Sequence, residues 1–247
     1  MTCSRIALLG VAVASLSMGL AQAAVTVIRP TDSNATGYAS DHGGVWWYTH
    51  DNSNLLDSGS NPAMVNTGSY DLSTYVWPND KNDLNDNNVR WQTHPNHGTL
   101  GQQAVVYDLG AVYDIASVHL WNFNNQDSSD RYVKQMDFYK VSGLSAIGRV
   151  DIGDTTAVAN QAAIDSWTGG VSATFVQPAV PGAYPGETQD LSGTLSGVRY
   201  LAVVPRTAGA GEYFGFDEIR FIAAVPEPTS LALLGLGGMA LLTRRRK

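Results

Sequence analysis

The chain has 247 residues, of which 15 are basic and 22 acidic, so its formal net charge is −7. Charged residues make up 15% of the chain, well below the roughly 25% of an ordinary soluble domain. This composition argues against a coiled coil and against a charge-rich disordered chain, and the acidic balance argues against a nucleic-acid-binding surface. The length suits one large β domain or two small ones.

The start of the chain has the layout of a secretory signal peptide. A single basic residue, Arg5, precedes an apolar run over residues 6–20, and an A-x-A cleavage site follows at residues 21–23. Residues 1–23 are therefore predicted to be removed on export. The only cysteine, Cys3, leaves with them, so the exported domain has no disulfide and depends on its core and on any metal ion it holds.

Short stretches of alternating apolar and polar residues follow, separated by turns rich in Gly, Asn, Asp, Ser and Pro. The clearest predicted strands lie at residues 104–109, 115–123, 133–141, 198–204 and 213–222, and weaker ones at 25–29, 45–49, 147–152, 171–177 and 187–191. Only residues 155–166 suit a helix. Many short strands with so little helix predict an all-β fold, an antiparallel β-sandwich or jelly roll.

The end of the chain combines three features in a fixed order. The motif Val225, Pro226, Glu227 and Pro228 comes first, an apolar run from Leu231 to Leu242 follows, and the basic residues Arg244, Arg245, Arg246 and Lys247 close the chain. As a helix, residues 229–243 would span about 22 Å, less than the ~30 Å core of a bilayer. Such a segment inserts with local thinning of the bilayer and keeps its basic end in the cytoplasm.

This order resembles the PEP-CTERM sorting signal, over residues 225–247. The resemblance implies recognition by an exosortase, a membrane-embedded cysteine-type transpeptidase, and a Gram-negative-type host that makes exopolysaccharide or biofilm matrix. It further implies that the protein is exported, is anchored in the inner membrane before processing, and then reaches the cell surface or the extracellular matrix. An ordinary tail anchor is the alternative.

A second resemblance covers roughly residues 60–222. The string VVYDLGAVYDIASVHLWNFN, then RYVKQMDFYKVSG, and finally the strands at 198–201 and 215–221 resemble the discoidin or coagulation-factor C-type family. That family implies a galactose-binding-like β-sandwich whose members bind glycans, lipid head groups or proteins through loops at one end. The sandwich is then expected over residues 61–224, and residues 24–60 are either part of it or a strand-bearing N-terminal extension.

The same resemblance implies a structural calcium ion, since many members hold one. Glu218, in an E-I-x-F pattern, corresponds to an acidic ligand of that ion. The remaining oxygens would come from an early loop, through Asn66, Thr67 and Asp71. Asn66 stands where many members have Asp, and the alternative is an ion pair between Glu218 and Arg220 or Arg199.

Sugar binding needs an aromatic face for the pyranose ring, flanked by side chains that form hydrogen bonds. Trp46, Trp47 and Trp77 are the candidate aromatic residues, and Arg131 lies at the exit of a polar loop where it either contacts a ligand or holds that loop. The alternative for Trp46 and Trp47 is that strand alternation buries one of them in the core.

Catalytic residues are not predicted. The sequence has no G-x-S-x-G or H-E-x-x-H motif, and its exported part has no cysteine nucleophile. We therefore expect an exported, non-enzymatic protein of the cell surface or extracellular matrix that binds polysaccharide. Two alternatives stay open at this point, an envelope or matrix protein with protein contacts only and a polysaccharide-active hydrolase.

Overall fold

The computed structural model describes residues 26–35, 56–57, 67–70, 72, 75–76, 91–92, 100–123, 131–148, 156–178, 184–209 and 214–224. Both end segments lie outside this part of the chain, and so do several predicted site residues, namely Trp46, Trp47, Asn66, Asp71 and Trp77.

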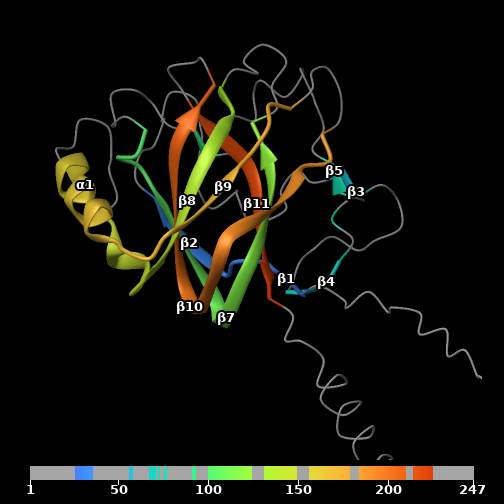
Figure 1. The fold of residues 1–247 in the computed structure, drawn as a ribbon, viewed down its shortest axis with the longest axis horizontal. Coiled ribbons are helices and arrows are strands. Elements are labelled where there is room, and N and C mark those ends of the chain that lie inside the picture. The colour runs from blue at the N-terminus through green and yellow to red at the C-terminus, as the bar shows by residue number, and fades with distance from the viewer. Residues whose placement is uncertain are drawn as a thin grey trace, which may run out of the picture.

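A long two-stranded ribbon is the basis of the fold. Strand β7 (Val105–Asn122) runs antiparallel to β10 (Glu187–Ala208), from the pair Val105–Val203 to the pair Leu120–Glu187. The ribbon turns back on itself near its middle, so that its two halves face each other across one core (Figure 1). The predicted strands at 104–109 and 115–123 are therefore two halves of one bent strand.

The bend in the ribbon is built around glycine. Register shifts interrupt the pairing of the two strands there, and each strand contributes a glycine with positive φ, Gly110 at 78° and Gly197 at 63°. Residues with a Cβ rarely adopt this conformation. The carboxylate of Asp108 accepts a hydrogen bond from the Gly110 amide at 2.8 Å and pairs with the Arg199 guanidinium at 3.1 Å, which braces the bend.

Each half of the ribbon is the centre of one layer. The first layer adds β2 (Asp32–Ala35) beside the first half of β7, then β8 (Val133–Val141) beside the second half of β10 and β9 (Val171–Thr174) beside β8. All these pairs are antiparallel.

The second layer adds β11 (Gly215–Ala223) beside the second half of β7, and the short strands β1 (Thr26–Ile28), β4 (Gly68–Ser69) and β6 (Trp91–Gln92) extend it. A separate pair joins β3 (Leu56–Asp57) to β5 (Tyr75–Val76). The predicted antiparallel β-sandwich is confirmed.

The core lies between the two layers and follows the alternation of the strands. Tyr107, from the first half of β7, meets Phe221 of β11 edge to face, with ring centroids 5.5 Å apart. Both rings are fully buried, as are Phe138 of β8 and Leu201 of β10. Burying a side chain of this size contributes about 1.5–3 kcal/mol, so this shared core accounts for a large part of the fold's stability.

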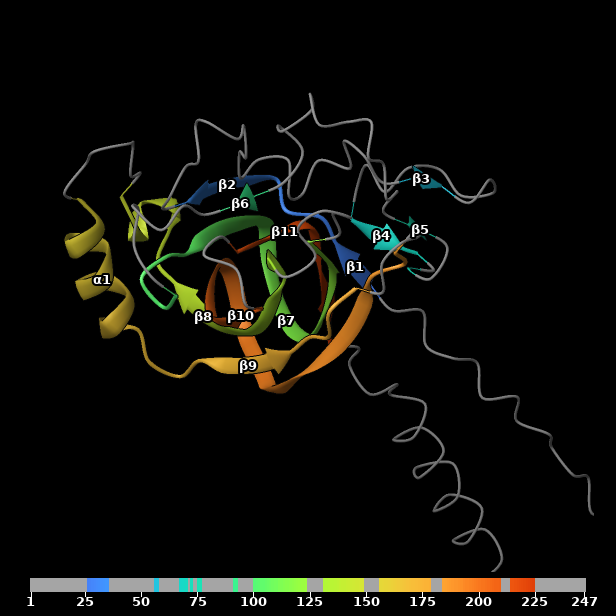
Figure 2. The ribbon, with the colours of Figure 1, turned by 90° about the horizontal axis from the view of Figure 1, so that it is seen from above.

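A helix covers the outer face of the first layer. Helix α1 (Thr156–Ser166), which the sequence predicts, packs with the 3-10 turn η6 (Leu144–Ala146) on that side (Figure 2). The strands present small side chains there, which leaves room for the helix; these are Ala104, Val106, Ala202 and Val204, packed with Ile147 and Ile164.

The predicted strand at 147–152 differs from the structure in its described part. Ile147 and Gly148 follow η6 and belong to no strand. The side chain of Asn160 on α1 takes the place of a neighbouring strand. Its amide oxygen accepts a hydrogen bond from the Gly148 N–H at 2.7 Å, and its amide nitrogen donates one to the Gly148 carbonyl at 2.9 Å. This contact ties the segment to the helix, and the Asn34 side chain of β2 ties it to the sheet by donating to the Leu144 and Ile147 carbonyls at 3.0 Å.

Candidate functional site

The sandwich has two ends that differ in construction. At one end the ribbon bends through residues 110–114, and we call it the bend end. At the other end β7 and β10 finish while β8 and β11 begin, and we call it the loop end (Figure 1). Residues 124–130, between β7 and β8, and residues 210–213, between β10 and β11, lie outside the described part of the chain.

A buried asparagine joins the end of β7 to the start of β8. The amide group of Asn122 donates to the Val133 carbonyl at 2.7 Å, and its oxygen accepts from the Val133 N–H at 2.9 Å and from the Phe123 N–H at 3.0 Å. Asn122 is fully buried. Three side-chain hydrogen bonds thus hold the exit of β7 against the entry of β8, as a strand pair would.

Arg131 lies two residues before Val133, next to these Asn122 hydrogen bonds at the loop end. Its neighbour Tyr132 forms a parallel bridge with Gly215, and the Tyr132 carbonyl accepts from the Gly209 N–H at 2.9 Å. Three chain segments therefore meet beside Arg131, which is half-buried. Its predicted companions Trp46, Trp47 and Trp77 lie outside the described residues, so their sugar-binding role stays a prediction.

Charged side chains are buried on the outer face of the second layer. Glu218 and Arg220 of β11 are both fully buried and form an ion pair, and the Arg220 Nη1 group also donates to the Ile219 carbonyl at 2.6 Å. Of the two partners that the sequence left open for Glu218, the structure shows Arg220. Arg199 pairs with Asp108 instead.

A calcium ion fits this site only in part. The Glu218 carboxylate is the kind of ligand that calcium prefers, and the pairing of Gly68 with Val27 and of Val27 with Ile222 brings the segment carrying Thr67 to the same layer. However, Arg220 already neutralises Glu218. Within the described residues, no three His, Cys, Asp or Glu side chains come together. Asn66 and Asp71 lie outside that part of the chain.

His119 lies beside the ion pair, on β7. Its Nε2 is 3.2 Å from the Pro185 carbonyl and its Nδ1 is 2.7 Å from the Thr188 hydroxyl. Because a carbonyl only accepts, the proton belongs on Nε2 and the neutral ring satisfies both contacts. Burial lowers the pKa of His119 to about 4; the Pro185 contact opposes this shift, and the charge of Arg220 adds to it.

The indole of Trp121 completes this outer face. It contacts the His119 ring edge to face, with centroids 4.2 Å apart, and its Nε1 donates to the Tyr75 carbonyl at 3.3 Å. Trp121 is fully buried with Tyr75 and Ile222.

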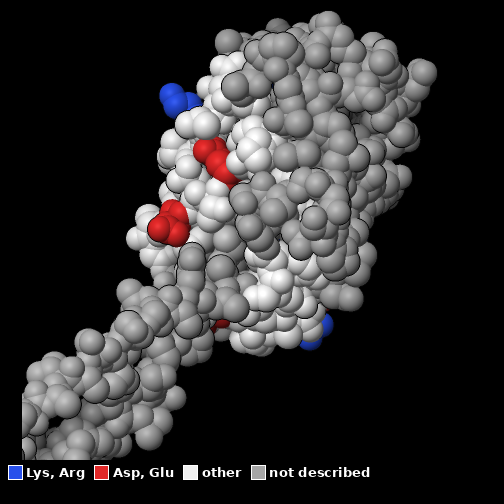
Figure 3. Space-filling view, turned by 90° about the vertical axis from the view of Figure 1, so that its right-hand side faces the viewer, with Lys and Arg blue, Asp and Glu red and all other residues white. Residues whose placement is uncertain are grey.

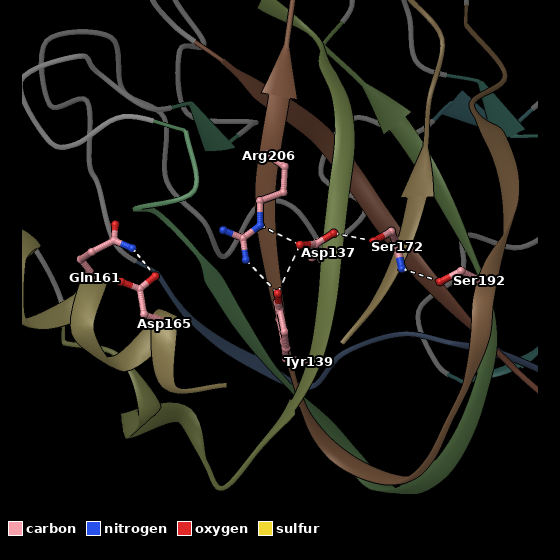
Figure 4. A network of polar contacts seen from close by, with 7 residues as sticks. All are labelled: Asp137, Tyr139, Gln161, Asp165, Ser172, Ser192 and Arg206. Atoms are coloured by element: carbon pink, nitrogen blue, oxygen red, sulfur yellow. Dashed lines mark hydrogen bonds and ion pairs between the residues drawn. The ribbon is translucent and has the colours of Figure 1, made fainter. Parts of the chain in front are cut away.

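A polar network crosses the first layer (Figure 4). The Asp137 carboxylate accepts from Arg206 Nε at 2.7 Å, from the Ser172 hydroxyl at 2.6 Å and from the Tyr139 hydroxyl at 3.2 Å. Arg206 also donates to the Tyr139 hydroxyl at 2.8 Å, and the Ser172 N–H donates to the Ser192 hydroxyl at 2.9 Å. The network joins β8, β9 and both halves of β10. Most hydrogen-bonding groups of these side chains bond to one another, so we assign the network a structural role.

The surface and the helices add two observations. On the face shown in Figure 3, the described surface is mostly uncharged, with separate acidic patches and basic groups that do not gather. Over the described ranges, no helix has the length and apolar character needed to cross a membrane.

Comparison with known proteins gives one match in sequence and several in structure. Residues 224–247 match the PEP-CTERM protein-sorting motif, as the sequence predicts. No curated protein matches the chain.

The similar solved structures include an F5/8 type C domain from Bacteroides fragilis, with a TM-score of 0.45 and 10% identity over 83% of this chain and 99% of that chain. They also include the family 32 carbohydrate-binding module of Clostridium perfringens NanJ in complex with galactose, with a TM-score of 0.39 and 9% identity over 80% and 98%. A third is the corresponding module of AlyQ in complex with 4,5-unsaturated mannuronic acid, with a TM-score of 0.39 and 12% identity over 80% and 98%. These are the kinds of domain that the sequence resemblance anticipates.

Proposed function

We propose that the chain is an exported, non-enzymatic surface or matrix protein that is sorted through its C-terminal segment and binds polysaccharide through its loop end. The observation that carries the sorting part is the match of residues 224–247 to the sorting motif. The motif begins at the last described residue, Ala224, directly after β11. An exosortase is then the processing partner, and the tail holds the protein in the inner membrane before processing.

The construction of the loop end supports the binding part. Asn122 ties the end of β7 to the start of β8, and Arg131 stands beside the junction of three chain segments. A rigid scaffold that carries irregular loops at one end is a common arrangement for ligand binding. Trp46, Trp47 and Trp77 are the proposed stacking partners for the sugar rings.

Polysaccharide binding can be tested with the mature protein on a panel of neutral and acidic polysaccharides. We expect retention on at least one polysaccharide, and a weakening of about tenfold when Arg131→Ala removes a charged hydrogen-bond donor, which corresponds to about 1.4 kcal/mol. Lys140→Ala, a change of similar size on an exposed lysine of β8 near the bend end, is the matched control. Retention on none of the polysaccharides would favour the protein-contact alternative, and release of soluble sugar would favour a hydrolase.

Structural calcium is a separate proposal. Glu218 would be its buried carboxylate ligand, and Asn66, Thr67 and Asp71 would supply the further oxygens. A bound ion stabilises the folded state by mass action, so calcium should raise the melting temperature of chelator-treated protein while magnesium at the same concentration does not. An unchanged melting temperature would overturn the calcium proposal and leave the ion pair with Arg220 as the observed role of Glu218.

A further inference from the structure

Both ends of the described chain lie at the bend end of the sandwich. Strand β1 runs antiparallel to β11 with Val27 opposite Ile222, so Thr26 lies beside the final residues of β11. At the same place the Ala224 N–H donates to the Asp114 carbonyl, which belongs to the bend, at 2.6 Å. Thr26 and Ala224, the two ends of this part of the chain, are therefore neighbours, and β1 lies beside the end of β11 (Figure 1).

Few residues separate the sandwich from the apolar part of the tail. Ala224 is fixed to the bend, and six residues, 225–230, stand between it and Leu231. Two of the six are prolines. An extended chain with a rise of about 3.1 Å per residue covers ~22 Å in the seven steps from Ala224 to Leu231.

The sandwich is at least as long as this tether. From Asp114 to Asn122 the second half of β7 takes eight steps, which is about 26 Å at a strand's rise of about 3.3 Å per residue. With Leu231 at the surface of a bilayer, a taut tether keeps Ala224 within ~22 Å of that surface. The domain therefore cannot stand upright with its loop end on the bilayer, because that position would place Ala224 about 26 Å away.

We propose that the bend end faces the lipid bilayer while the tail is inserted, and that the loop end faces away from it. This inference rests on the proposed sorting through the tail. It assigns the two ends different partners, since residues 110–114 and 224 face the lipid surface and the end that carries Arg131 faces the polysaccharide.

Two exposed valines offer matched probes of this orientation. Val112 lies in the bend and is 66% exposed, and Val176 is 61% exposed. Val176 lies at the loop end, because the preceding residue, Phe175, donates its N–H to the Lys134 carbonyl near the start of β8. The chain's only cysteine is Cys3, so a Cys3→Ser background allows each valine to be replaced by a single cysteine.

The test uses the full-length chain isolated with its tail from a host without exosortase and placed in vesicles of neutral lipid. A donor dye on Val112→Cys or Val176→Cys reports energy transfer to an acceptor on the lipid head groups. We expect transfer from position 112 to be about twofold or more stronger, because roughly 26 Å of strand separates the two ends. Equal transfer from both positions, or stronger transfer from position 176, would overturn the orientation.

A second pair of positions guards against local effects of the label. Lys140 and Lys134 lie on one strand, near the bend end and the loop end respectively. We expect stronger energy transfer to the lipid from Lys140→Cys than from Lys134→Cys. A flexible linker of about 20 residues inserted after Ala224 extends the tether by about 25 Å on average, and should abolish the difference in both pairs. If the chain failed to bind vesicles at all, the proposed sorting function itself would fail; binding with the wrong order of transfer would overturn the orientation alone.

Discussion

Acid is expected to destabilise the fold through His119. The ring is 3% exposed, contacts Pro185 and Thr188 through its two nitrogens, and lies next to Arg220. The folded chain therefore favours the neutral ring, and protonation would place a second positive charge beside the buried guanidinium. The unfolded chain exposes the ring to water and binds a proton at the ordinary pKa.

The size of the effect follows from the two pKa values. The folded pKa, about 4, is lower than the unfolded pKa, 6.5, so this contribution to stability is fully present above pH 6.5 and is lost as the pH falls toward 4. Linkage between protonation and unfolding gives a loss of about 2 kcal/mol at pH 5 and ~3 kcal/mol once the pH is below both values.

The contribution of His119 to stability can be isolated by urea unfolding of the mature protein at pH 7 and pH 5. The wild type is compared with His119→Gln. The variant cannot titrate at position 119, while all carboxylates are common to both proteins. We expect the free energy of unfolding to fall by about 2 kcal/mol more in the wild type than in the variant. A fall of equal size in both proteins, or an NMR titration that gives His119 a pKa near 6.5, would refute the reasoning.

Three further substitutions test individual parts of the structure by urea unfolding. Asn122→Ala removes three buried hydrogen bonds and should lower the free energy of unfolding by about 2–3 kcal/mol. A decrease of less than about 0.5 kcal/mol would mean that these hydrogen bonds do not hold β7 against β8. Glu218→Gln leaves Arg220 buried without its counter-charge and should cost about 3–5 kcal/mol, whereas replacing both residues by Met should cost less than the single change; a larger cost for the double variant would contradict the pairing. Gly110→Ala meets the Thr31 side chain at 2.8 Å in a positive-φ conformation and should cost about 1–2 kcal/mol, while an unchanged midpoint would show that the bend tolerates a Cβ.

The regular elements were predictable from the sequence because their signals are local. The alternation at 133–141 gives the bounds of β8, and the predicted helix at 155–166 differs from α1 by one residue. Strand β2 was missed because Asp-Ser-Asn-Ala has the composition of a turn. Its strand conformation comes from pairing with the start of β7. The sequence of these four residues does not indicate which strand they pair with.

The site was less predictable because its contacts join residues that are distant in the sequence. Asn122 and Val133 are 11 residues apart, and Asp137 and Arg206 are 69 apart. Only the folded register brings each pair together. For Glu218, the residue type left a metal ion and an arginine open as partners, and the alternation of β11, which puts Arg220 on the same face, was the one signal that pointed to the ion pair.

Mass spectrometry of the C-terminus of the protein recovered from the native cell surface or matrix tests the central claim most directly. Sorting by an exosortase predicts a chain that retains β11 but has lost the apolar run and the four basic residues that follow it. Recovery of that protein with Lys247 still attached would contradict the account.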